Sequence, residues 1–447
     1  MGRYFGTDGI RGVANSELTP ELAYKLARAS AYRLEEDNNK LIIIGKDTRI
    51  SGDMLEAALV AGYTSMGFDV KLLGVIPTPA VAHLVLEYNA EAGIVISASH
   101  NSFEFNGIKY FGSDGYKLPD EVEADIEDLI DNYKSIEERP VAKDLGRVIY
   151  DHEAASKYKE YLEKCASIKL DGYKVALDCG NGATYKIAPE IFKELGAEVI
   201  SINTEPNGVN INDKCGSTHP EDLQKLVVEN NCNIGFAYDG DGDRLITVDE
   251  KGNLLDGDHF LAILSMHLKE IGKLENNGVV GTVMTNIGLG EFCNTQEINL
   301  IKASVGDRYV LEKMLQEGYC IGGEQSGHII FKEHATTGDG ILSSLMLMQV
   351  VVESSKKVSE LNDLMTTYPQ VLVNAKVENE FKKSYETDEE IQEEIKRVEA
   401  IFEGQGRVLI RPSGTEPLVR VMIEGKDLEI LEREANKIAL LIESKFF

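Results

Sequence analysis

Three aspartates at alternate positions are the feature of the sequence with the clearest chemistry. Asp239, Asp241 and Asp243 are separated by single glycines, and Arg244 follows them. This spacing lets three carboxylates curl around one hard cation, and Mg²⁺ and Ca²⁺ both prefer oxygen ligands. A solvated acidic turn is the plain alternative, but carboxylates so close together repel one another unless a cation lies between them. The stretch therefore predicts a divalent metal site.

An EF-hand calcium loop is the rival metal site, since Glu250 falls at its twelfth position. That loop needs glycine at its sixth position for a sharp turn, and Arg244 stands there instead. The flanking residues 234–238 and 245–248 also predict strands, whereas an EF-hand lies between two helices. Both observations favour a magnesium site.

A polar loop at residues 97–101 reads Ser-Ala-Ser-His-Asn and contains Ser99 and His100. A serine in a polar loop commonly has no catalytic role, so this stretch decides little by itself. The sequence contains no G-x-S-x-G elbow and no GK[ST] phosphate loop, which argues against an α/β-hydrolase and a P-loop enzyme. With a metal loop elsewhere in the chain, the hydroxyl of Ser99 could carry a phosphoryl group whose charge a cation neutralises.

Residues 411–417 read Arg-Pro-Ser-Gly-Thr-Glu-Pro and precede Arg420. A turn with a glycine, two hydroxyls and backbone N–H groups suits a phosphate, and arginine supplies a fork for its oxygens. An ordinary capping turn is the alternative.

Two further stretches are ambiguous by themselves. Residues 323–328 read Gly-Glu-Gln-Ser-Gly-His and offer partners for sugar hydroxyls, plus one imidazole that titrates near neutral pH. A lone histidine is more often structural. Lys109 ends the stretch Asn-Gly-Ile-Lys and is either a surface lysine or an acid/base group.

A repeated plan of elements must position these loops. Aliphatic strands are predicted at residues 41–44, 175–177 and 279–283, each followed by a polar loop and a segment with helical period. Each of the three stretches then reaches a small apolar strand that runs into one of the loops 97–101, 239–244 and 324–328. Strands that alternate with helices predict α/β domains with largely parallel sheets, in which ligands bind beyond the carboxyl ends of strands.

The length of 447 residues exceeds what one hydrophobic core usually holds, so roughly three or four domains are expected. We predict three similar mixed α/β domains and a smaller C-terminal α+β domain. Their boundaries are predicted at residues 1–150 with the serine loop, 151–255 with the metal loop, 256–368 with the Gly-Glu-Gln-Ser-Gly-His loop, and 369–447 with the Arg-Pro-Ser-Gly-Thr-Glu-Pro loop.

The formal net charge of −29 argues against a nucleic-acid partner and an acidic membrane surface, because that field repels phosphate. An anionic substrate therefore needs a local basic pocket. Residues 1–12 lack a signal-peptide pattern, and the nearly apolar stretch 341–352 is shorter than the ~20 residues of a membrane span. Six cysteines without a C-x-x-C pair predict neither disulfides nor zinc, and reduced thiols predict a cytoplasmic protein.

The motifs, in this order, resemble the α-D-phosphohexomutase superfamily over essentially the whole chain. The opening Tyr-Phe-Gly-Thr-Asp-Gly-Ile-Arg-Gly at residues 4–12, Gln325 and the Arg-Pro-Ser-Gly-Thr-Glu-Pro stretch are most similar to bacterial members that act on glucosamine phosphates. The resemblance implies four domains around a central active-site cleft. It also implies an isomerase that interconverts 6- and 1-phosphates through a phosphoserine and a 1,6-bisphosphate, and so feeds the synthesis of UDP-N-acetylglucosamine and peptidoglycan precursors.

The resemblance implies a role for each matching residue. The catalytic set would be the phosphoserine Ser99, the acid/base candidates Lys109 and His328, and Arg11, Arg244 and His100 near the reacting phosphate. One Mg²⁺ per subunit would bind Asp239, Asp241, Asp243 and a phosphate oxygen of Ser99. Glu324 and Ser326 would hold sugar hydroxyls, and Arg411, Ser413, Gly414, Thr415 and Arg420 would bind the non-reacting phosphate.

Hexosamine or glucose 1,6-bisphosphate would serve as primer and intermediate. The nearest alternative is a phosphoglucomutase or phosphomannomutase with the same mechanism. A metal-dependent sugar phosphatase would use similar groups but admit water, and a non-catalytic calcium- or sugar-binding protein would leave the serine, lysine and arginine loops unexplained. A homodimer is compatible with the resemblance, and the sequence leaves the oligomeric state open.

Overall fold

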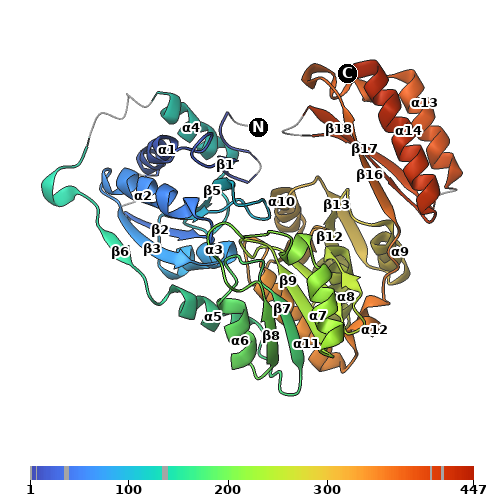
Figure 1. Cartoon of the computed structure of the whole chain (residues 1–447), viewed down its shortest axis with the longest axis horizontal. Helices are drawn as coiled ribbons and strands as arrows, with labels where there is room; N and C mark the ends of the chain where they lie inside the picture. Colours follow the sequence, from blue (N-terminus) through green and yellow to red (C-terminus); the bar gives the residue numbers. More distant parts are fainter. Residues whose placement is uncertain (1–2, 7, 35–39, 133–138, 403–404, 414–416) are drawn as a thin grey trace. The chain divides into compact units, whose positions relative to one another are not determined.

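The computed structural model describes residues 3–6, 8–34, 40–132, 139–402, 405–413 and 417–447. The chain divides into two compact units (Figure 1). The first contains Met1–Thr285 and Gln296–Leu364, and the second contains Asn286–Thr295 and Met365–Phe447. Three of the sheets belong to the first unit and one to the second.

The first sheet has six strands in the order β1-β5-β4-β2-β3-β6. Its strands are β1 (Ile10–Val13), β2 (Leu41–Lys46), β3 (Asp69–Val75), β4 (Ala92–Ile96), β5 (Phe105–Gly112) and β6 (Val148–Tyr150). The helices of this region are α1 (Pro20–Arg33), α2 (Ser51–Thr64), α3 (Thr78–Glu87) and α4 (Asp120–Asp131). The Thr19 hydroxyl caps α1 by accepting a hydrogen bond from the Leu22 amide at 3.2 Å, and Pro20 suits the first turn.

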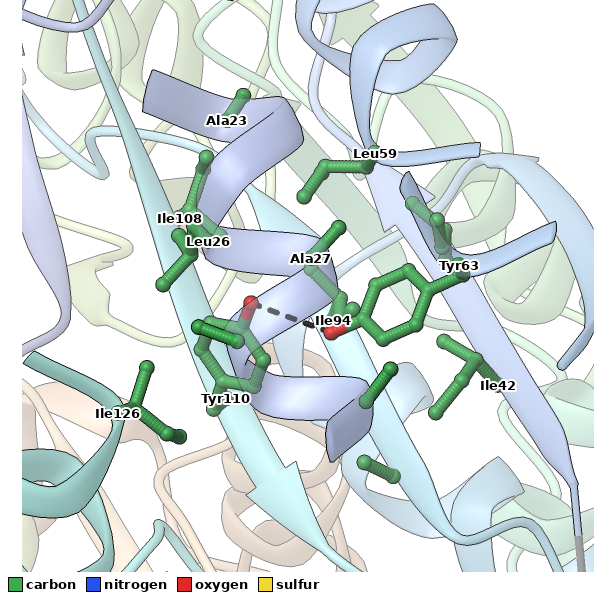
Figure 2. Close-up of a cluster of buried hydrophobic side chains, with 14 of the residues drawn as sticks. Ala23, Leu26, Ala27, Ile42, Leu59, Tyr63, Ile94, Ile108, Tyr110 and Ile126 are labelled. Atoms are coloured by element: carbon green, nitrogen blue, oxygen red, sulfur yellow. Dashed lines mark hydrogen bonds between the residues drawn. The ribbon is translucent and has the colours of Figure 1, made fainter. Parts of the chain in front are cut away.

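Figure 2 shows the core between α1, α2, α4 and one face of this sheet. Leu26 of α1, Leu59 of α2 and Ile126 of α4 meet strand residues such as Ile42, and all four are fully buried. The Tyr63 hydroxyl bonds the Tyr110 hydroxyl at 3.2 Å, and the buried Ser30 hydroxyl contacts both, so these polar atoms inside the core have partners.

The second sheet has the order β11-β10-β9-β7-β8, and the third has the order β13-β12-β14-β15. The second is built from β7 (Lys174–Asp178), β8 (Glu198–Ile202), β9 (Ile234–Tyr238), β10 (Leu245–Asp249) and β11 (Leu254–Leu255), with helices α5 (Ala154–Cys165), α6 (Ile187–Glu194) and α7 (Glu221–Glu229). The third is built from β12 (Gly278–Thr282), β13 (Asn299–Ala303), β14 (Ile321–Gly323) and β15 (Ile329–Phe331), with α8 (Gly257–Glu270), α10 (Asp307–Glu317), α11 (Gly340–Ser354) and α12 (Val358–Asn362).

The three sheets share one four-strand pattern, as the repeated plan predicted. The orders β5-β4-β2-β3, β10-β9-β7-β8 and β15-β14-β12-β13 correspond strand by strand. The last three strands of each order are parallel, and the first runs antiparallel. Three of the four strands in each pattern therefore follow the expectation of parallel sheets, and the fourth does not. The strands β5, β10 and β15 follow the loops 97–101, 239–244 and 324–328. Each runs antiparallel to the strand before its loop, because a short loop can join only antiparallel neighbours.

The second unit contains the antiparallel sheet β16-β18-β17. Its strands are β16 (Gln370–Lys376), β17 (Arg407–Pro412) and β18 (Leu418–Glu424), packed with α13 (Glu389–Ile401) and α14 (Leu428–Phe446). This arrangement confirms the predicted α+β character. The unit also takes α9 (Ile287–Thr295), whose Ile287 amide donates to Glu424 at 2.8 Å. The four predicted domain boundaries stay predictions.

Among the described helices, none combines the length and apolar character needed to cross a membrane.

Candidate active site

Ser99 lies in the loop between β4 and β5 and is held in an uncommon backbone conformation. Its side chain is buried, and its φ of 51° lies in the left-handed region that non-glycine residues rarely adopt. The Ser99 hydroxyl donates to Asp239 Oδ2 at 2.6 Å, and its amide donates to the Ser97 hydroxyl at 3.0 Å. The sheet therefore holds this hydroxyl directly against the acidic loop of the second sheet.

Two side chains clamp the backbone of this loop. Arg49 donates to the carbonyl oxygens of Ser99 and Asn101 at 2.9 and 2.8 Å. Asn212 donates to the same two oxygens at 2.9 Å each. Arg49 is in turn fixed by Asp47 at 2.9 Å, and neither side chain is exposed. Sequence analysis missed Arg49 and Asn212, although the polar stretch after β2 was a signal for the first.

The three aspartates of the acidic loop form one buried cluster between β9 and β10. One oxygen of each lies within 4.8 Å of the others. Burial, together with the charges of Asp243 and Asp241, raises the pKa of Asp239 well above its usual range. Among the described residues, Asp241 Oδ1 and Asp243 Oδ1 find no hydrogen-bond partner. Buried oxygens without partners are costly, and a divalent cation would satisfy them, so the residues present fit such an ion. The flanking strands are inconsistent with an EF-hand.

Lys109 on β5 is buried, so the surface-lysine interpretation is wrong. Its ammonium lies 2.8 Å from Asp241 Oδ2, 2.9 Å from Asp8 Oδ2 and 3.6 Å from Asp243 Oδ2. Burial opposes the charge on Lys109, but Asp241, Asp8 and Asp243 outweigh it and raise the pKa. Lys109 is therefore a charged ammonium, and it belongs to the same cluster as Asp239, which accepts the hydrogen bond from Ser99.

Arg244 and His100 meet beside this cluster. The Arg244 amide donates to Asp239 Oδ1 at 3.1 Å, and its guanidinium lies 3.2 Å from His100 Nδ1. Burial and the charges of Arg244 and Arg11 lower the pKa of His100 to about 4. His100 is therefore neutral near pH 7 and accepts a hydrogen bond from Arg244. Arg11 lies in the same region, because its guanidinium contacts Asp8, and Asp8 also contacts Lys109.

His328 is buried at the end of the loop between β14 and β15. Its Nε2 accepts a hydrogen bond from the Gly338 amide at 2.9 Å, and its Nδ1 lies 3.7 Å from Asp243 Oδ2. Burial lowers the pKa of His328, but Asp243, Asp307 and Glu324 together outweigh burial and raise it. The Gly338 contact needs the Nε2 lone pair and so favours a proton on Nδ1, on the side of Asp243.

Glu324 and Ser326 belong to the same loop but differ in exposure. Glu324 is half-buried and accepts a hydrogen bond from the Gly306 amide at 3.0 Å, whereas Ser326 is exposed. The Leu245 amide donates to the Gly327 carbonyl at 3.1 Å. This backbone contact places the acidic loop beside the Glu324 loop within the first unit.

The predicted phosphate-binding residues belong to the second unit. Arg411 on β17 stands directly opposite Arg420 on β18. Ser413 is buried, and its carbonyl accepts a hydrogen bond from Lys382 at 3.0 Å. Guanidinium groups on two directly opposite strand residues suit an anion. Sequence analysis missed Lys382. The predicted residues Gly414 and Thr415 lie outside the described residues.

Four family models match the chain, all described as domains of phosphoglucomutase/phosphomannomutase. The α/β/α domains I, II and III match residues 2–137, 156–252 and 256–368, and the C-terminal domain matches residues 372–441. Curated relatives include the phosphoglucosamine mutase of Finegoldia magna, 59% identical over 100% of this chain and 99% of the relative. That of Clostridioides difficile is 54% identical over the whole of both chains.

Solved structures show the same fold. A phosphoglucomutase/phosphomannomutase family protein of Burkholderia thailandensis has a TM-score of 0.81 at 23% identity, covering 99% of this chain and 98% of its own. The N-acetylphosphoglucosamine mutase of Aspergillus fumigatus, in complex with GlcNAc-6P and magnesium, has a TM-score of 0.73 at 17% identity, covering 100% and 96%.

Proposed function

Because the chain belongs to the phosphoglucomutase/phosphomannomutase family, we propose that it is the isomerase that interconverts glucosamine 6-phosphate and glucosamine 1-phosphate. The choice of an amino sugar is supported by relatives of 53–59% identity that span the whole chain and are phosphoglucosamine mutases. Glucose or mannose phosphates are the alternative substrates within the same mechanism.

One observation carries the proposal: the buried Ser99 hydroxyl lies 2.6 Å from Asp239 in a cluster of three carboxylates. A phosphoryl group on this oxygen would add negative charge to an already acidic site, so the arrangement requires a cation. Asp239, Asp241 and Asp243 would hold Mg²⁺, which when bound neutralises phosphate oxygens.

The reaction needs two phosphoryl transfers. In the first, the bond from phosphorus to Ser99 Oγ breaks, and a bond forms to the free hydroxyl of the sugar phosphate, which gives a 1,6-bisphosphate. The sugar then turns round, and its other phosphoryl group returns to Ser99. Lys109 and His328 are the candidates for moving the hydroxyl protons, and Arg11, Arg244 and His100 for positioning the charged oxygens.

The two ends of the sugar need separate contacts. Glu324 and Ser326 are proposed to hold its hydroxyls. Arg411, Ser413 and Arg420, together with Gly414 and Thr415, are proposed to hold the phosphate that does not react. A hexosamine or glucose 1,6-bisphosphate would prime Ser99. The six free cysteines support a reducing compartment, and we assign the enzyme to the cytoplasm.

The test has two parts. A panel of glucosamine, glucose and mannose phosphates with a trace of bisphosphate should give the highest kcat/KM for glucosamine phosphate. Intact-mass measurement should show one added phosphate on some of the protein, and Ser99→Ala should remove it and lower turnover by several orders of magnitude. The control is Ser102→Ala, at an exposed serine of the same loop. This variant should keep the added phosphate and the wild-type turnover. Near-normal turnover in Ser99→Ala would end the proposal, and net release of inorganic phosphate would indicate a phosphatase instead.

A further inference from the structure

A lysine outside the predicted site bridges two carboxylates at its edge. Lys117 lies between β5 and α4, and its ammonium donates to Asp8 Oδ1 at 2.6 Å and contacts Asp307 Oδ2. Asp8 precedes β1, and Asp307 begins α10. Each of the three side chains is only about one-fifth exposed, at 18, 21 and 18%. This bridge therefore joins a loop of the first sheet to a helix of the third.

Both carboxylates of the bridge also contact groups of the candidate active site. Asp8 uses its second oxygen, Oδ2, to hold the Lys109 ammonium at 2.9 Å. Asp307 Oδ2 lies 3.6 Å from His328 Nε2. Asp243 lies between Lys109 and His328: its Oδ2 is 3.6 Å from Lys109 Nζ and 3.7 Å from His328 Nδ1. The Lys109, Asp8, Lys117 and Asp307 side chains thus form a chain of ion pairs, and its end at Asp307 lies beside His328, whose Nε2 accepts its hydrogen bond from Gly338.

Asp8 differs from the other two carboxylates around Lys109 because it is not part of the acidic cluster. The other two, Asp241 and Asp243, belong to the acidic cluster that fits a cation. Asp8 is outside that cluster and can hold Lys109 whatever the cluster binds. Asp8 can do so only if its own orientation is fixed. Arg11 contacts the same oxygen that faces Lys109, and Lys117 holds the opposite oxygen.

The charges of the bridge depend on one another. Burial opposes the charge on Lys117, but Asp307 and Asp8 outweigh it and raise its pKa. Burial likewise opposes ionisation of Asp8, yet Lys109 and Lys117 hold its pKa well below the usual range. Without the Lys117 ammonium, Asp8 and Asp307 would face each other as two half-buried like charges and would turn apart.

We propose that Lys117 is a positioning residue for phosphoryl transfer, which acts through Asp8 on Lys109. This inference rests on the proposed mutase activity. Lys117 makes no bond to the sugar in this role. Its removal should therefore displace the Lys109 ammonium without weakening the binding of substrate.

The main variant is Lys117→Met, which keeps the length of the side chain but removes the charge. Its kcat should fall on the order of 100-fold, as expected for misplaced catalytic groups, while KM for glucosamine 6-phosphate stays within about threefold. Lys117→Arg keeps the charge and should restore at least a tenth of the wild-type kcat. The matched control is Lys159→Met: Lys159 also bridges two carboxylates, Glu190 and Glu194, and is 16% exposed, but it lies on α5 away from the site. The control should lose no more than half of kcat.

A double variant separates positioning from general stability. In an Asp8→Asn background the bridge to Lys109 is already broken, so adding Lys117→Met should cost much less than it does in the wild type. Equal losses in both backgrounds would overturn the proposal, and so would a Lys117→Met enzyme with near wild-type kcat or one with raised KM and unchanged kcat. A wild-type protein without mutase activity would instead refute the proposed function itself.

Discussion

At the scale of single residues, neighbouring charges distinguish two aspartates of the buried acidic cluster. Burial and its neighbours raise the pKa of Asp239, whereas Lys109 and His328 outweigh burial and lower the pKa of Asp243. The cluster is thus only partly compensated by the protein's own positive groups. A divalent cation would neutralise the remaining negative charge. Metal binding should therefore raise the free energy of unfolding, which can be measured.

Asp241→Asn should reduce that stabilisation. For the wild type, saturating Mg²⁺ should raise Tm by several degrees, because an ion that binds only the folded state adds about 2.7 kcal/mol at 100 times its Kd. Asp241→Asn removes one ligand charge and should show a much smaller rise, together with a large loss of activity. Asp222→Asn, at a surface position, should behave like the wild type. Thermal melts with EDTA and with Mg²⁺ provide the measurement, and equal Mg²⁺ shifts in wild type and Asp241→Asn would contradict the site.

Asp339 gives the stability a specific pH dependence. It caps the N-terminus of α11, accepts hydrogen bonds from the Leu342 amide and the Tyr158 hydroxyl, and is fully buried. Burial raises the pKa of Asp339 to about 6. The folded state therefore holds this proton more tightly than the unfolded state, so the contribution of Asp339 to stability is present below about pH 4 and is lost as pH rises through about 6.

Asp339→Asn should remove this dependence, because the amide keeps the cap without titrating. Relative to wild type, the variant should gain on the order of 3 kcal/mol in unfolding free energy between pH 4 and pH 7. Urea unfolding at several pH values measures the difference. A constant difference across this range would show that folding does not raise the pKa of Asp339.

At the scale of elements, the loops of the candidate active site depend on close backbone contact between sheets. Gly327 has φ of +90°, and a Cβ there would lie 2.0 Å from the Leu245 carbonyl oxygen. A side chain at this position would therefore push the loop of Glu324 and His328 away from the acidic loop.

Gly327→Ala and Gly272→Ala form a matched pair. Gly272 also has positive φ, +69°, but a Cβ there meets nothing within 4 Å. Gly272→Ala should cost only the backbone strain of about 1–2 kcal/mol and leave kcat unchanged. Gly327→Ala should cost several kcal/mol more and lower kcat, because backbone must move. Denaturant unfolding and steady-state kinetics distinguish the two, and equal effects would mean that the contact has no role.

At the scale of the whole molecule, the proposed chemistry is divided between two compact units. Ser99, the acidic cluster and Lys109 belong to the first unit, and Arg411 and Arg420 belong to the second.

Arg420→Lys tests this division. The change keeps the charge but loses the bidentate fork, so KM should rise for both glucosamine 6-phosphate and glucosamine 1-phosphate. More free bisphosphate should also escape during turnover, while phosphorylation of Ser99 survives because that chemistry belongs to the first unit. Arg433→Lys, an exposed arginine of the second unit, is the control and should change neither KM. Unchanged KM values in Arg420→Lys would make Arg420 an ordinary structural arginine.

The sequence by itself determined the features that depend on near neighbours in the chain. The alternation of Asp239, Asp241 and Asp243 predicted a metal-binding loop, and the structure gathers these residues into a buried cluster. Short aliphatic runs predicted the central strands of three repeated sheets, since strand formation and burial follow from local side-chain pattern. The motifs in their order indicated the family that the comparisons show. The individual roles of Ser99, Lys109 and the arginines remain predictions.

Only the tertiary structure decided which distant groups meet. Arg49 and Asn212 clamp the Ser99 loop from elements that lie 50 and 113 residues away, and no local pattern marks such partners. Lys117 meets Asp8 across 109 residues and Asp307 across 190. The same lysine in a solvated loop would be an ordinary charge. Burial between two carboxylates makes it a bridge, because charges interact strongly only where water is excluded, and the packing of the sheets determines where that happens.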